Sequence, residues 1–144
     1  MKKKILIILP IILLGGGYVA KGKLMPPKVV KPKIAGTIYI LPHQFTLNLK
    51  DGHYATLTVA LELAAGQSDG ASPDNTPAAG SVVGTLPEEA VIRAIITNEV
   101  TNQGSTALID QPGRTDLQRQ ILSDIKSETD VKVDQVFFTD VAVQ

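Results

Sequence analysis

The stretch FTLNLKDGHYATLTVALEL, residues 45–63, contains two apolar runs with a turn between them. Every second residue is apolar before the turn, at Phe45, Leu47 and Leu49, and again after it, from Ala55 to Leu63. Alternation with a period of two is typical of β-strands that have one buried face. The stretch therefore predicts a β-hairpin.

The length of the turn decides which faces of the two strands meet. A two-residue turn at Asp51-Gly52 would put the apolar residues of the two strands on opposite faces of the sheet. A three-residue turn at Lys50-Asp51-Gly52, with Gly52 in the left-handed conformation, brings apolar residues together instead. This register predicts the pairs Leu47–Ala55, Phe45–Leu57, Leu41–Leu61 and Thr46–Thr56.

Two segments after the hairpin have helical patterns. Thr85-Leu86-Pro87-Glu88 and Thr115-Asp116-Leu117-Gln118 both fit the capping box that opens a helix. Each precedes apolar residues at helical spacing, which predicts one buried stripe per helix. The first stripe comprises Val91, Ile92, Ile95, Ile96 and Val100, and the second comprises Leu117, Ile121, Leu122 and Ile125.

The segment from Val131 to Val143 is rich in β-branched and aromatic residues and predicts a strand. Its alternation breaks, because Val133 falls on one face whereas Val136 and Phe138 fall on the other. Either a bulge near Gln135 restores the alternation, or both faces are covered. Two covered faces would require a partner surface, which makes Val136 and Phe138 candidates for an oligomer interface. The alternative is that a helix of the same domain covers them.

An uncharged run from Ile5 to Ala20 follows Lys2-Lys3-Lys4 and has no polar face. We therefore expect residues 1–25 to form a short cytoplasmic tail and a transmembrane anchor rather than a core helix. Cleavage as a signal peptide after Ala20 would place Tyr18 where a small residue is needed, which favours an uncleaved anchor. The side chains expected in lipid are Ile5, Leu6, Ile7, Ile8, Leu9, Ile11, Ile12, Leu13 and Leu14.

Residues 26–36 are rich in lysine and proline and predict a stiff, extended linker. Residues 37–144 are then one domain, in which residues 67–84 read as a mobile loop because they are rich in Gly, Ser, Pro, Asp and Ala. Lysines lie on both sides of the anchor, so the positive-inside rule leaves its orientation open.

The formal net charge of the 144 residues is zero, but every charge before Lys50 is a lysine and the rest of the chain is acidic. The lysines fit a lipid membrane with anionic headgroups, whereas an acidic body offers no basic face for nucleic acid. Cysteine is absent, which excludes disulfides and cysteine metal sites.

The remaining polar residues form no recognisable site. His43 and His53 would lie roughly 20 Å apart at about 3.3 Å per strand residue, too far to share a zinc ion. Asp69, Asp74 and Asn75 lack the spacing of a calcium loop, and Glu88-Glu89 suits the start of a helix. We expect no catalytic residue, cofactor or metal, and no enzyme activity.

Three stretches carry a resemblance to a known family: Ile40 to Leu49, Tyr54 to Leu63 and, most specifically, Val133 to Val141. Beyond Gly36 nearly the whole chain resembles the flagellar basal-body-associated FliL family. The resemblance implies an α+β fold in which an N-terminal transmembrane helix precedes a small antiparallel sheet, made of the hairpin and the C-terminal strand and packed with two helices. That domain is similar to the stomatin-type scaffold domain.

The resemblance also implies a single-pass protein of the bacterial inner membrane, with its C-terminal domain outside the cytoplasm, at the flagellar basal body. Such proteins associate with the stator and other basal-body proteins as homo-oligomeric rings. They support torque generation in motility, chemotaxis and swarming without catalysis. The alternative is an anchored, stomatin-like membrane scaffold with no link to flagella.

Overall fold

The computed structural model describes residues 33–144 except 73, 75, 78–80 and 82. The predicted anchor and most of the linker lie outside the described residues. Within the described part, no helix is both long enough and apolar enough to cross a membrane. In chain order the elements are β1 (Thr37–Ile40), β2 (Phe45–Asn48), β3 (Tyr54–Leu63), α2 (Glu89–Thr101), α3 (Ser105–Ile109), α4 (Gln111–Glu128) and β4 (Val133–Val143).

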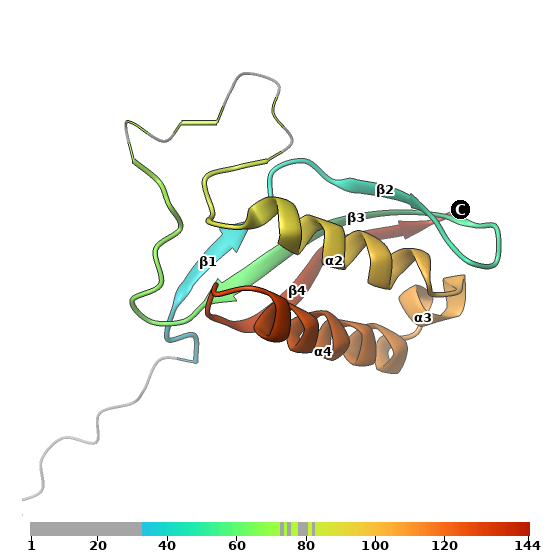
Figure 1. The fold of residues 1–144 in the computed structure, drawn as a ribbon. Coiled ribbons are helices and arrows are strands. Elements are labelled where there is room, and N and C mark those ends of the chain that lie inside the picture. The colour runs from blue at the N-terminus through green and yellow to red at the C-terminus, as the bar shows by residue number, and fades with distance from the viewer. Residues whose placement is uncertain (1–32, 73, 75, 78–80, 82) are drawn as a thin grey trace, which may run out of the picture. The chain divides into compact units, whose positions relative to one another are not determined.

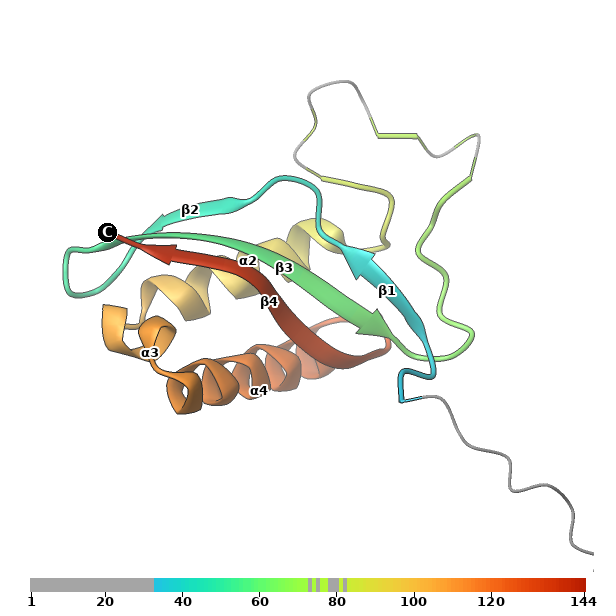
Figure 2. The ribbon, with the colours of Figure 1, turned by 180° about the vertical axis from the view of Figure 1, so that it is seen from behind.

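The domain has an α+β fold with two layers, as expected. Strand β3 is the centre of an antiparallel sheet, paired with β4 along one edge and with β1 and β2 along the other. Helices α2 and α4 pack on one face of the sheet (Figure 1), and the opposite face, called here the outer face, carries no helix (Figure 2). The core between the layers includes Leu57, Leu61, Ile92, Ile96 and Ile121.

The predicted hairpin register is confirmed at its turn end. Phe45 pairs with Leu57, Thr46 with Thr56 and Leu47 with Ala55. Gly52 has φ 86°, and its N–H donates a hydrogen bond of 3.0 Å to Leu49 O. The turn therefore has three residues and a left-handed glycine, as the alternation required.

The predicted pair Leu41–Leu61 is wrong. Leu41 N donates to Val59 O at 3.0 Å, and Leu61 pairs with Tyr39. The register shifts because Pro42 has no N–H for the ladder and His43 has φ 59°, so two extra residues are accommodated between β1 and β2. The first strand of the hairpin is thus divided, and the sheet has four strands where three were expected.

The predicted start of the first helix is wrong, although most of its stripe is correct. Glu88 has φ 55° and precedes α2 without a side-chain cap, while the Thr85 hydroxyl donates to Asp69 O instead. Val91 is exposed, because it lies on the solvent side of α2. The other four members of the stripe are buried, namely Ile92, Ile95, Ile96 and Val100.

The second helix, α4, also begins elsewhere than predicted. It starts at Gln111, with Pro112 in its first turn, and the Thr115 hydroxyl donates to Gln111 O within the helix. Proline in a first turn is a common helix start, and here it outweighs the capping box. Leu117, Ile121 and Ile125 are buried as predicted, and Leu122 is partly buried against the core. The short helix α3 was not anticipated.

Strand β4 contains bulges, which was one of the two alternatives for its broken alternation. Asp134 and Thr139 are extra residues at two shifts in the β3–β4 register. Because of the bulges, the apolar residues of β4 that pair with buried residues of β3 lie on the face of the sheet that the helices cover. The resulting pairs are Val133–Leu63, Val136–Leu61, Phe138–Val59, Val141–Leu57 and Val143–Ala55.

Candidate interaction surfaces and polar contacts

The two histidines have separate surroundings. His43 Nε2 lies 2.9 Å from Ser81 O, and His53 Nδ1 lies 3.2 Å from Asp51 Oδ1. Among the described residues, no three His, Asp or Glu side chains are grouped so that they could hold a metal ion. The two histidines therefore do not lie in one common site in the described structure.

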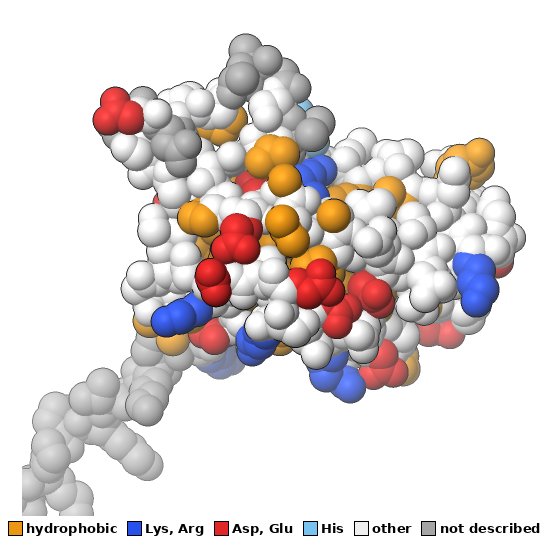
Figure 3. Space-filling view, viewed as in Figure 1, with side chains coloured by type: hydrophobic (Ala, Val, Ile, Leu, Met, Phe, Trp, Pro, Cys, Tyr) orange, Lys and Arg blue, Asp and Glu red, His pale blue; other side chains and the backbone are white. Residues whose placement is uncertain are grey.

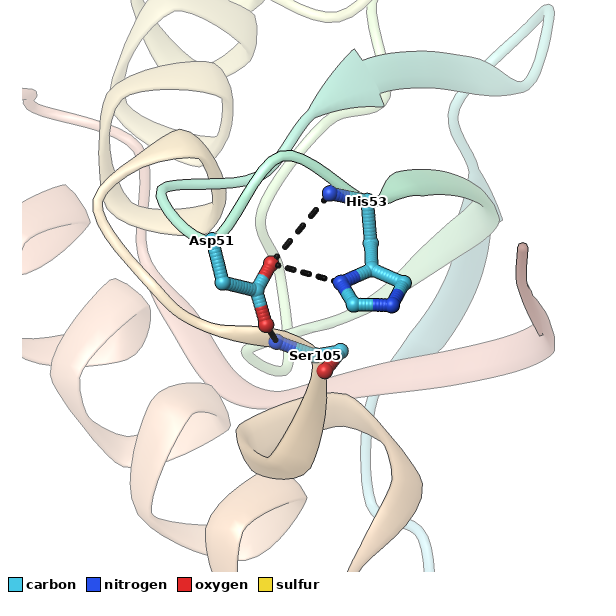
Figure 4. Close-up of polar contacts among 3 residues, drawn as sticks. All are labelled: Asp51, His53 and Ser105. Carbon is cyan, nitrogen blue, oxygen red and sulfur yellow. Dashed lines mark hydrogen bonds and ion pairs between the residues drawn. The ribbon is translucent and has the colours of Figure 1, made fainter.

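Asp51 connects the hairpin turn to the start of α3 (Figure 4). Its Oδ2 accepts a hydrogen bond of 2.7 Å from Ser105 N, and its Oδ1 lies 3.4 Å from His53 N. The preceding residue, Gly104, has no side chain to cap α3, so the carboxylate supplies the cap from a distant part of the chain. Hydrogen bonds from the Ser105 side chain and backbone, with a smaller contribution from His53, hold the pKa of Asp51 below its usual range.

A second polar contact is buried between β1 and α2. Tyr39 Oη donates to Glu89 Oε2 at 2.6 Å and accepts a hydrogen bond from Thr85 N at 3.1 Å. Burial and the bond to Glu89 raise the pKa of Tyr39. Glu89 Oε1 is buried without a hydrogen-bond partner among the described residues. A Cβ on Gly84 would lie 2.1 Å from Tyr39 Oη, so a larger residue there would displace the side chains that make this contact.

The acidic pair Glu88-Glu89 therefore has a tertiary role that sequence reasoning missed. Glu88 Oε1 accepts a hydrogen bond from Asp130 N at 3.2 Å, and Glu89 holds Tyr39. Both contacts join segments that are about 40 or 50 residues apart in sequence. No local pattern could have indicated either partner.

Two of the hollows on the described surface lie beside α4 and are open. One of about 440 Å³ is lined in part by Thr129, Asp130 and Lys132, but the Thr129 hydroxyl donates to Ile125 O at 2.8 Å. Another of about 180 Å³ lies between α4 and β4 and is lined in part by Leu122 and Val136.

Val136 and Phe138, the candidate interface residues, face the helices. Val136 is buried, and Phe138 is partly buried and packs against the core. Helix α4 lies against β4, and the hollow between them contains Leu122 and Val136. In the structure, other residues of the same domain therefore cover these two side chains.

The outer face of the sheet carries exposed apolar side chains that sequence reasoning did not single out. Ile40 and Phe137 flank Ala60 in one cross-strand row, and Ile38 lies in the next row beside Glu62. Ile38 and Ile40 are exposed and Phe137 is partly exposed, whereas Ala60 between them is buried. These residues form an apolar patch on the outer face of the sheet.

The chain enters the domain across this same outer face. Ala35 N donates to Glu62 Oε1 at 3.2 Å, and a Cβ on Gly36 would lie only 1.5 Å from Leu63 O. Glu62 is buried although its carboxylate is on the outer face. The Ala35–Gly36 segment thus holds the start of β1 tightly against β3, with Ile34 exposed beside it.

Comparison with protein families matches residues 38–144 to the family described as flagellar basal body-associated protein FliL. The matched range includes β2, β3, β4 and all three described helices, together with most of β1. No curated protein matches the chain.

Proposed function

Because the chain belongs to the FliL family of flagellar basal body-associated proteins, we propose that it is a non-catalytic, membrane-anchored motor component that supports the stator. The observation that carries the proposal is the extent of the match, which spans nearly the whole folded domain. In this proposal the segment from Ile5 to Ala20 crosses the bacterial inner membrane and the domain lies outside the cytoplasm.

The polar contacts of the domain support a structural role. Asp51 caps α3, and Tyr39 and Glu89 join β1 to α2. Each of these groups is held in place by the fold, and together they form no arrangement of nucleophile, base and oxyanion donor. The observations that fit a scaffold unrelated to flagella fit the flagellar proposal equally well, and the family match favours the flagellar proposal.

We propose further that the chain works as a homo-oligomeric collar around the stator. Anchoring in two dimensions raises the effective concentration of neighbouring copies, so modest contacts between domains suffice for assembly. Contacts between two different surfaces of neighbouring copies form a ring when the rotation from one copy to the next closes. Val136 and Phe138 would contribute indirectly, because they hold β4 in position against α4.

Deletion of the gene tests the motor role. Cells without the protein should swim nearly normally in thin medium and fail in viscous medium or on swarm plates, because support of the stator matters most under load. Re-expression of the intact chain should restore movement, whereas the domain exported on a cleaved signal peptide should not, since it lacks the anchor.

Full motility of the deletion strain under load would refute the motor role. The anchor has its own test, since N-terminal sequencing of the membrane fraction should begin at or near Met1. A sequence that begins at Lys21 would show cleavage after Ala20 and refute an uncleaved anchor.

A further inference from the structure

The outer face of the sheet is unusual in its share of exposed apolar side chains. The exposed large apolar side chains of the described chain are Ile34, Ile38, Ile40, Tyr54, Val91 and Ile109. The first three belong to β1 or the residues just before it, and Phe137 adds to them across the sheet. A contiguous apolar patch of this kind marks a surface that contacts something other than water.

We infer that the patch of Ile38, Ile40 and Phe137 is a lipid-facing surface, by which the domain lies on the headgroup region of an anionic membrane. The inference rests on the membrane anchoring in the proposed function. It adds an orientation: the outer face of the sheet is turned toward the bilayer and helices α2 and α4 are turned away from it.

The distribution of charge supports this orientation. Acidic and basic side chains both lie on the face shown in Figure 3, with the acidic ones in excess. Residues 85–131, which include α2 and α4, carry eight acidic side chains against the four basic ones of Arg93, Arg114, Arg119 and Lys126. On the outer face, by contrast, Glu62 is buried and accepts a hydrogen bond from Ala35 N, and Asp140 lies beyond the patch beside Thr58. A negative membrane surface attracts the less acidic side and repels the helices.

Basic residues are frequent in the sequence just before the domain. Lys28, Lys31 and Lys33 fall within the six residues that precede Ile34. An anionic lipid surface attracts lysines that lie close to it. Apolar side chains and lysines that adjoin each other are the combination that interfacial membrane binding requires.

The length of the connecting chain keeps the patch within reach of lipid. Twelve residues, Lys21 to Pro32, separate the apolar run from Lys33. Fully extended, they span at most about 40 Å. A tethered domain therefore meets the bilayer at a high effective concentration, and a small apolar patch is enough to bias its orientation.

The edges of the sheet are poor alternatives for a protein partner. Strand β4 has bulges at Asp134 and Thr139, and the opposite edge is interrupted at Pro42 and His43. Bulges, charges and proline on edge strands oppose the addition of a further strand. A binding surface of the sheet is therefore its outer face, where the exposed apolar side chains lie, rather than one of its edges.

The test uses tryptophan as a reporter, because the natural chain has none. Ile38→Trp and Ile40→Trp place it on the outer face. Val91→Trp and Ile109→Trp are matched controls on the helices, since Val91 is as exposed as Ile38 at 41% and Ile109 is as exposed as Ile40 at 60%. Each full-length variant is inserted into vesicles of zwitterionic and anionic phospholipid that carry bromine at a shallow acyl position.

The Ile38→Trp and Ile40→Trp variants should lose most of their emission to the bromines, whereas the Val91→Trp and Ile109→Trp variants should keep theirs. The loss should diminish at high salt or without anionic lipid, because the attraction of the lysines is then screened or absent. Extraction at alkaline pH verifies that every variant is inserted.

Four results would overturn the inference. An inserted chain in which the outer-face reporters are not quenched, or in which all four reporters are quenched equally, refutes the orientation alone. Shielding of the outer-face reporters that grows with the number of chains per vesicle, without quenching by bromine, assigns the patch to a second copy. A chain that fails to insert refutes the anchoring as well.

Discussion

At the scale of single residues, Gly52 carries the conformational demand of the hairpin turn. Its φ is 86°, and no heavy atom lies within 4 Å of the point that a Cβ would occupy, so strain in the backbone alone decides what a substitution does. Gly52→Val should lower the free energy of unfolding by at least about 1 kcal/mol, because a β-branched residue is strained at positive φ.

Gly52→Asn is the matched control, because asparagine tolerates the left-handed region better than valine. Denaturant unfolding of both variants should rank wild type above Asn and Asn above Val. A Gly52→Val variant with the midpoint of the wild type would contradict the left-handed turn.

The carboxylate of Asp51 makes the stability of the hairpin turn depend on pH. Its pKa is lowered in the folded state, mainly by Ser105, so its contribution is present above the unfolded pKa of about 3.9 and is lost as the pH falls through the folded value. Asp51→Ala should therefore lower the thermal midpoint at neutral pH, and its difference from the wild type should shrink in acid.

Asp51→Asn separates charge from hydrogen bonding, because the amide oxygen still accepts from Ser105 N. Its loss of thermal midpoint should be smaller than that of Asp51→Ala and should vary little with pH. A difference between wild type and Asp51→Ala that is constant from neutral to acid pH would rule out the carboxylate as the cause.

Individual caps and polar contacts were the part of the structure least accessible from sequence. Thr85 has the right spacing for a capping box, yet its hydroxyl bonds to Asp69 O, 16 residues away. Glu89 has a partner 50 residues away, Tyr39. Local spacing specifies which bonds are available to a side chain, and tertiary packing chooses among them.

At the scale of elements, the alternation of side chains along β4 gives two neighbouring residues opposite surroundings. Val136 is buried against β3 and α4, whereas Phe137 is on the outer face. Val136→Asp should lower the free energy of unfolding by at least about 2 kcal/mol, because it removes a buried valine and adds a charge.

Phe137→Asp is the control, and denaturant unfolding should show a much smaller effect. Equal losses in the two variants would contradict the register of β4. If the lipid-facing patch is correct, Phe137→Asp should also weaken the quenching of the Ile40→Trp reporter while the domain remains folded.

Phe45 tests the division of the hairpin's first strand. It is buried at the start of β2, and the Arg93 guanidinium lies 4.3 Å from the centroid of its ring. Phe45→Ala should lower the free energy of unfolding by roughly 3–5 kcal/mol. Thr46→Ala, at the adjacent exposed position, should change it little. If calorimetry shows that Phe45→Ala is as stable as the wild type, the face of β2 that carries Phe45 is not the buried one.

The elements themselves were largely predictable, because period and turn geometry are local properties. The pairs from Phe45 to Ala55 followed from alternation and the length of the turn. The error at Leu41 arose because the chain kinks at Pro42 and His43, where Arg93 Nη1 also donates to Pro42 O at 2.7 Å. A contact from another element can shift a register that the strand pattern alone leaves regular.

At the scale of the whole molecule, the domain contains its own core. The buried apolar residues of the described chain run from Leu41 to Val136. A chain that begins at Lys33 should therefore unfold at the same thermal midpoint as the intact protein. A chain that begins at Thr37 should unfold at a lower temperature, because it lacks the bond from Ala35 N to Glu62 and leaves that carboxylate uncapped.

Differential scanning calorimetry of the two truncated chains checks this expectation. A lower midpoint for the chain that begins at Lys33 would mean that earlier residues contribute to the fold. Equal midpoints for both would mean that the Glu62 contact contributes nothing.

The attachment at Ala35 and Gly36 also decides how the domain responds to mechanical force. A pull on the chain before Lys33 reaches β1 first and passes from it into β3, the strand with partners along both edges. Force parallel to β1 loads its hydrogen bonds to β3 together, whereas force perpendicular to the strand breaks them one after another from Thr37. The domain therefore withstands the largest force when it is pulled parallel to β1. A force perpendicular to β1 detaches this strand from β3 before the helices unfold.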